Sequence, residues 1–124
     1  MRMISTRIPF YVAFLTTFVL LLSSCIKIDV PPSIEIHVVD EFSNPIDQAF
    51  VGIFQNVDEW GMKENPVQAW KKTQEDGTVI FVELLEMNYY VVVEKGKLNN
   101  LRNEIRTTEV LKENRITKLV IHID

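Results

Sequence analysis

Short segments in which apolar and polar residues alternate follow one another beyond residue 32, and they predict strands. Residues 33–38 alternate strictly, with apolar side chains at Ile34, Ile36 and Val38. This period of two is typical of a strand with one buried face. The segment 49–54 is apolar on both faces, as a central strand would be, and Gly52 within it is typical of a bulge. Nowhere after residue 25 does an apolar period of 3.6 persist for three turns, so no long helix is predicted.

Four further segments have the same character and are predicted as strands: 67–73, 79–82, 89–94 and 115–123. The pair Asp76-Gly77 predicts a tight hairpin, because glycine accepts the positive φ of such a turn. The polar segments 55–66 and 95–103 are predicted as loops, and 105–110 is either an edge strand or more loop. Six or seven short strands separated by turns predict an all-β fold, a single antiparallel β-sandwich.

The first 25 residues have a different pattern. Residues 8–22 form an apolar run of 15, which is short of the ~20 that a membrane-spanning helix needs. Arg2 and Arg7 precede the core of this run, and no acidic residue occurs before Asp29. A basic start, an apolar run and a small-residue exit are the three parts of an export signal.

The end of that signal, Leu22-Ser23-Ser24-Cys25, resembles the lipobox of bacterial lipoproteins. In that family the cysteine thiol takes a diacylglycerol and the signal is cleaved on the N-terminal side of the cysteine. The resemblance implies a signal peptide over 1–24, a lipidated Cys25 with a short tether over 25–32, and a domain over 33–124. It also implies a lipid anchor in the bacterial cell envelope, at the outer membrane or the cell surface. The alternative is an uncleaved anchor, or a plain signal whose cysteine is accidental.

The composition of the expected mature chain limits the classes of partner that it could bind. Removal of residues 1–24 leaves 124 − 24 = 100 residues with 11 basic and 17 acidic side chains, a net charge of −6. Nucleic acid is not expected as a partner, because phosphate binding needs clustered lysine and arginine. Cys25 is the one cysteine, so no disulfide is expected and the domain depends on its core.

The order of several residues resembles the transthyretin-like (prealbumin-like) sandwich, which occurs in carboxypeptidase regulatory domains and in the B-repeats of collagen-binding adhesins. The similar residues are Asp40, Asn44-Pro45-Ile46, Ala49, Val51, Thr73, Asp76-Gly77, Phe81, Leu85 and Tyr90. Asn44 and Asn88 stand where that family has glycine. The resemblance implies inward-facing aromatic rings at Phe81 and Tyr90, and a non-catalytic accessory domain.

One family feature is not expected here. Glu94 resembles the glutamate that assists a Lys–Asn isopeptide bond in adhesin repeats. Val38 stands where the lysine would be, and 115–123 offers no asparagine. Glu94 is therefore predicted to be an ordinary carboxylate at a strand end.

The loop around Trp60 is the candidate contact site for a ligand or partner. Asn56, Asp58 and Glu59 stand beside the ring, and an exposed indole with such neighbours suits a carbohydrate or a protein partner. The alternative is that Trp60 is a lid that folds back over the end of the core, since large aromatic residues are mostly buried.

Other polar residues are given structural interpretations. His37 and His122 are expected to face solvent on neighbouring strands, and the acidic turn at Asp40 lacks calcium-loop spacing. A locally basic stretch, Lys95 to Arg106, is expected to be a solvated loop, with an anionic partner as the alternative. No metal site, cofactor or catalytic set is predicted.

The sequence thus predicts a lipid-anchored envelope protein with a non-catalytic binding or scaffolding domain. A structural subunit of an adhesin or pilus is the alternative, and a small hydrolase of envelope polymers is a distant one.

Overall fold

The computed structural model describes residues 28–101 and 108–124 of the chain. The predicted signal peptide and Cys25 lie outside the described residues, as do residues 105–107 of the segment predicted as a possible edge strand. In the described part, no helix is long and apolar enough to cross a membrane.

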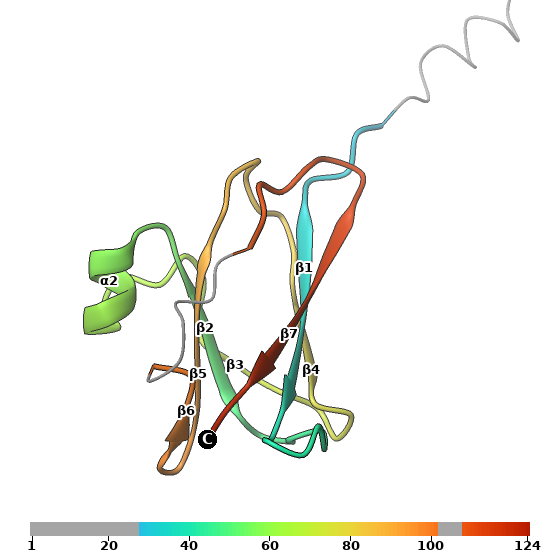
Figure 1. The fold of residues 1–124 in the computed structure, drawn as a ribbon. Helices are drawn as coiled ribbons and strands as arrows, with labels where there is room; N and C mark the ends of the chain where they lie inside the picture. The colour runs from blue at the N-terminus through green and yellow to red at the C-terminus, as the bar shows by residue number, and fades with distance from the viewer. Residues whose placement is uncertain (1–27, 102–107) are drawn as a thin grey trace, which may run out of the picture.

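Two sheets face each other in the domain, as Figure 1 shows. The first has the order β4-β1-β7 and the second the order β3-β2-β5-β6. The strands are β1 (Ser33–Val39), β2 (Phe50–Phe54), β3 (Lys71–Lys72), β4 (Thr78–Phe81), β5 (Tyr90–Lys95), β6 (Leu98–Asn99) and β7 (Ile116–His122). The prediction of an all-β sandwich of about seven strands is confirmed.

The sandwich is not entirely antiparallel, which corrects the prediction. β1 and β7 pair in parallel, while β1 pairs with β4 in the antiparallel sense. The reason lies in the segment before β7. Hydrogen bonds tie Thr108 to Tyr89, Leu111 to Met87 and Asn114 to Val30. These bonds carry the chain back to the end of the sandwich where β1 begins, so the last strand starts beside the first.

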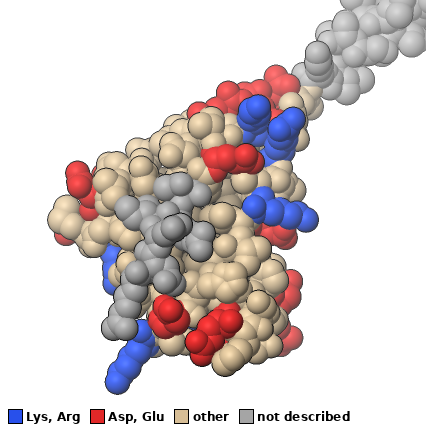
Figure 2. Space-filling model, viewed as in Figure 1, with Lys and Arg blue, Asp and Glu red and all other residues tan. Residues whose placement is uncertain are grey.

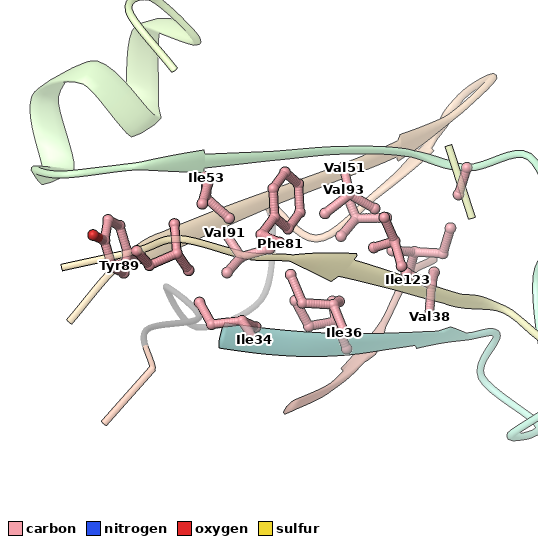
Figure 3. Close-up of a cluster of buried hydrophobic side chains, with 14 of the residues drawn as sticks. Ile34, Ile36, Val38, Val51, Ile53, Phe81, Tyr89, Val91, Val93 and Ile123 are labelled. Carbon is pink, nitrogen blue, oxygen red and sulfur yellow. The ribbon is translucent and has the colours of Figure 1, made fainter. Parts of the chain in front are cut away.

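The core lies between the two sheets (Figure 3). Alternate residues of β1 point inward and meet Val51, Ile53, Val91 and Val93 of the second sheet. Phe81 is fully buried among them, as expected. The inward tyrosine, however, is Tyr89 and not Tyr90, which lies half-buried on the outer face of the second sheet.

The position of Tyr89 is set by its hydroxyl group. It accepts a 2.9 Å hydrogen bond from the Leu85 N–H, an arrangement similar to the tyrosine corner of other sandwiches. In the same corner Leu84 is buried and Leu85 is exposed. Two of the residues quoted for the transthyretin-like resemblance, Leu85 and Tyr90, are therefore displaced by one position here. Asn44 and Asn88 also lack positive φ, which Ser43 adopts instead.

The turn at Asp76-Gly77 forms, but it does not join two paired strands. The Gly77 N–H donates to the Gln74 carbonyl, and Gly77 has a φ of 78°. β3 before the turn pairs with β2, whereas β4 after it pairs with β1, so the turn connects the two sheets. A Cβ at Gly77 would lie 2.7 Å from the Val38 carbonyl oxygen, and only glycine allows this approach.

The strand predicted over 67–73 is reduced to β3. It is interrupted where the Trp70 ring lies across Gly52, whose added Cβ would be 3.0 Å from the ring. Gly52 is in regular register with Val92, so it is not a bulge. Its missing side chain leaves room for the Trp70 indole to pack on the strand.

A helix and a short strand replace parts of the predicted loops. α2 (Val57–Met62) lies within 55–66, and β6 lies within 95–103. Residues 108–110, at the end of the possible edge strand, form none.

Candidate functional site

The second sheet is covered on its outer face by a small core of its own. Phe54, Trp60 and Val92 are buried there, and Trp70, Tyr90 and Leu101 pack against them. Helix α2 lies over β2 and β5 on the side away from β1 and β7 (Figure 1). We call this the covered face.

Trp60 is part of this cover and not an exposed platform. Its side chain is 8% exposed, and its Nε1–H donates a 2.8 Å hydrogen bond to the Val91 carbonyl. Trp70, which lies in the segment 67–73 predicted as a strand, is half-buried and meets Phe54 edge to face at 5.9 Å. The hypothesis of sugar stacking on Trp60 is wrong, because the apolar sheet face beneath α2 takes up the indole. The lid interpretation holds, although the lid covers a sheet face and not the end of the core.

The three polar neighbours of Trp60 belong to the start of α2. Asn56 is its N-cap, and its Oδ1 accepts a 2.8 Å hydrogen bond from the Glu59 N–H. Asp58 and Glu59 lie in the first turn, where their negative charges interact favourably with the positive end of the helix dipole. Asn-x-x-Glu is a capping sequence, and this signal predicts the helix that the apolar pattern missed. A role of these three side chains in ligand contact stays a prediction, now without the ring.

Asn100 is a structural residue that the sequence analysis missed. It is 1% exposed, and β6 ends just before it. Its Oδ1 accepts from the Val93 N–H at 3.0 Å, and its Nδ2 donates to the Val91 carbonyl at 2.8 Å. The side chain thus makes the hydrogen bonds to β5 that the backbone of a neighbouring strand would otherwise make. No local pattern marks this asparagine among the others of the segment.

The first sheet has a different outer face, on which none of the described elements packs. We call it the open face and define it by the outward residues of the three strands: Ser33, Glu35 and His37 on β1, Thr78 and Ile80 on β4, and Ile116, Lys118 and Val120 on β7. Its aliphatic side chains are well exposed, 44% for Ile80, 50% for Val120 and 59% for Ile116. Their β-branched shapes stand on the two outer strands.

The central strand of the open face is polar. Glu35 lies between Ile80 and Lys118, and its carboxylate is 3.7 Å from the Lys118 amine. His37 lies between Thr78 and Val120, and its Nε2 is inaccessible and without a hydrogen-bond partner among the described residues. Figure 2 shows the molecule from the direction of Figure 1, with the open face seen edge-on; acidic and basic side chains on the side in view lie scattered among uncharged ones.

A groove of about 590 Å³ runs beside the open face along β4. It is lined by Glu35, Lys71, Lys72, Gln74, Asp76, Thr78, Val79 and Ile80. Two side chains of the neighbouring segment cross to β4: the Lys71 amine donates to the Ile80 carbonyl at 2.8 Å, and Gln68 donates to the Val82 carbonyl at 2.7 Å. These contacts satisfy carbonyl groups on the edge of β4, which blunts that edge against strand addition.

The remaining candidate residues have structural partners. Asp40 accepts hydrogen bonds from the N–H groups of Asn44 and Phe42, and the first of these chiefly lowers its pKa. The Thr78 hydroxyl group in turn lowers the pKa of Asp76. His37 and His122 are on neighbouring strands as expected, but His122 is paired with Val39. In the described ranges no three metal-ligating side chains gather.

Glu94 forms an ordinary ion pair in the structure. It is on the side of β5 that carries Val92, facing the covered face, and it forms a salt bridge with Lys63 rather than with the adjacent Lys95. Lys95 instead bonds to Asp47 across the sheet edge. Val38, at the position of the absent lysine, is fully buried and registers with Ile121.

Comparison with known proteins shows that the chain is similar to other proteins in fold. No family model matches the chain. A search of curated proteins finds no match either. Among solved structures, the pilus 2b backbone protein of group B streptococcus aligns with a TM-score of 0.55 and 16% identity, covering 75% of this chain. The major pilin subunit of Bacillus cereus aligns with a TM-score of 0.49 and 13% identity, covering 77%. The chain spans 40% of the first of these proteins and 30% of the second. The likeness is to the β-sandwich fold.

Proposed function

We propose that this chain is a non-catalytic, lipid-anchored module of the bacterial cell envelope that binds another envelope protein through the open face. One observation carries the proposal: the covered face buries its aromatic rings under α2, while the open face leaves Ile80, Ile116 and Val120 exposed. Exposed aliphatic side chains gathered on one sheet face are typical of a protein contact.

The polar strip on β1 supports a protein partner over a lipid one. Glu35 of β1 and its neighbour Lys118 of β7 stand between the aliphatic residues and offer one acceptor and one donor group. A lipid surface would take this ion pair out of water at the centre of the contact without offering it further hydrogen bonds, which costs free energy.

Paired substitutions test the open face. Ile80→Asp together with Val120→Asp is expected to abolish the partner's co-purification from crosslinked membranes and to leave the amount of folded protein unchanged. Val57→Asp is the matched control, because Val57 is similarly exposed, at 41%, but lies on α2. Retention of the partner by the double variant, or its loss in the control as well, would contradict the proposal.

Anchoring is tested separately at Cys25, on the strength of Leu22-Ser23-Ser24-Cys25. Cys25→Ala is expected to block acylation and leave a precursor with residues 1–24 attached. Intact mass of the wild-type protein should show acyl chains. A wild-type mass without them would end this part of the proposal.

The second candidate is a structural subunit of a surface polymer. It is favoured by the edge of β7, which is seven residues long and carries no strand on its far side among the described residues. A similar fold occurs in pilus backbone proteins, and edge pairing is one way to join subunits. Detergent-extracted material would then run as a ladder or a very large particle, whereas a binding module would run as a small species.

A further inference from the structure

The first and last strands of the domain lie side by side and run in the same direction. β1 and β7 are in register over their whole length, from Ser33 opposite Ile116 to Val39 opposite His122. Figure 1 shows the chain entering at one end of this pair and the C-terminus lying at the other end. This arrangement determines how the domain responds when its two ends are pulled apart.

Hydrogen bonds at both ends define the ladder. The Ser33 N–H donates to the Arg115 carbonyl at 3.2 Å, and the Ile123 N–H donates to the Val39 carbonyl at 3.0 Å. Since both groups of a residue point to the same side of a strand, the odd-numbered residues of β7 bond to β1. The N–H groups of its even-numbered residues point to the free edge.

The contact continues above β1. The Val30 N–H donates to the Asn114 Oδ1, and the Asn114 N–H returns a bond to the Val30 carbonyl, each at 2.8 Å. Asn114 adopts a φ of 60°, which asparagine tolerates better than most residues. The segment that leads into β1 is therefore bonded to the turn that leads into β7.

We propose that the β1–β7 ladder is a load-bearing clamp. Tension between residues before Ser33 and residues after His122 pulls β1 and β7 along their axes in opposite directions. Such a shear loads all of the bonds of the ladder together, whereas a peeling force would load them one at a time. Resistance to force is set by the rate of unfolding under load, so the clamp acts as kinetic stability. This rests on the proposed function and deepens it, because a partner held by the exposed Ile116 and Val120 of β7 pulls that strand against β1, which leads to the lipid anchor at Cys25.

Single-molecule pulling in two directions tests the clamp. The chain from Cys25 onward contains the whole described core, so it is used without the preceding residues and without acylation. One handle is attached at Cys25. The other is attached after Asp124 for shear, or at Lys112→Cys for peeling, since the exposed Lys112 lies just before the turn at Asn114. The expected unfolding force is severalfold higher in shear, and equal forces in the two directions would overturn the proposal.

Two proline variants test whether the hydrogen bonds between β1 and β7 determine the unfolding force in shear. Thr117→Pro removes an N–H that bonds to β1, while Lys118→Pro removes one that faces the free edge. The shear force should fall clearly more in Thr117→Pro, and equal falls would overturn the role of the ladder. If Thr117→Pro does not fold, the comparison of shear with peeling in the wild-type chain decides. Because no lipid is used, failure here is distinct from failure of the anchoring test at Cys25.

Discussion

The two outer faces of the sandwich both carry apolar side chains, but these are covered on one face and exposed on the other. Each sheet has an inner side in the core and an outer side that carries apolar residues. On the covered face, the outer side of β2 and β5 holds Phe54 and Val92, and α2 brings Trp60 to bury them. On the open face, Ile80 and Val120 stay at the surface beside Glu35 and Lys118. The comparison teaches that the chain buries an outer face where it has a helix to cover it, and leaves the other exposed.

The largest effect is expected from removal of the cover. Trp60→Ala deletes a buried indole and its hydrogen bond to Val91, and it should lower the free energy of unfolding by about 3–5 kcal/mol. Trp70→Ala is the matched control and should cost less, because that ring is half-buried. Thermal or denaturant unfolding of the two variants side by side measures the difference. A larger loss for Trp70→Ala would reverse the assignment of the cover.

A smaller loss is expected at the edge of the covered sheet. Asn100→Ala leaves the buried Val93 N–H without an acceptor, a cost of about 1–3 kcal/mol. The Val91 carbonyl keeps its bond from Trp60, so the loss should stay below that of Trp60→Ala. Asn99→Ala is the control, since its side chain accepts a local hydrogen bond from the Leu101 N–H two residues away and none is seen from it to β5 among the described residues. Equal unfolding free energies for the two variants would contradict the role given to Asn100.

The helix that carries the cover can be weakened at its first residue. Asn56→Ala removes the cap of α2 and should cost about 1 kcal/mol, within a usual range of about 0.5–2. Asn56→Asp keeps an acceptor for the Glu59 N–H and should cost little. Denaturant midpoints measured for both would show whether capping, and not merely the loss of the amide, explains the change.

The smallest effect is expected on the open face. Ile80→Ala and Val120→Ala should each change the free energy of unfolding by no more than about 0.5 kcal/mol, because surface side chains contribute little to folding. Chemical denaturation checks this. Losses near those of Trp60→Ala would mean that the open face is packed in the folded protein, and the contrast between the two faces would disappear.

Much of the fold follows from local pattern. The strict alternation in 33–38 predicted β1, and the doubly apolar segment 49–54 predicted a central strand, since both patterns depend only on neighbouring residues. The resemblance to the transthyretin-like sandwich placed Phe81 in the core. It failed at Tyr89 and Tyr90, because two adjacent tyrosines fit either face and only the hydrogen bond to Leu85 selects the inward one.

The candidate site was less predictable. Trp60 was considered both as an exposed platform and as a lid, and its local sequence is compatible with either. Asn56 and Glu59 did carry a readable signal, the capping sequence of α2. Asn100 carried none, because its role depends on where β5 happens to lack a neighbour.

The sequence by itself determined most of the strands and the apolar core, since these depend on the order of residue types along the chain. The export signal and the lipidation of Cys25 stay predictions from the same kind of pattern. The tertiary structure alone decided that β7 runs parallel to β1, that β3 and β4 belong to different sheets, and that one outer face is covered while the other is open. Those features arise from contacts between residues far apart in the chain. A strand pattern states which side of a segment is apolar, but it does not state which segment will lie against it.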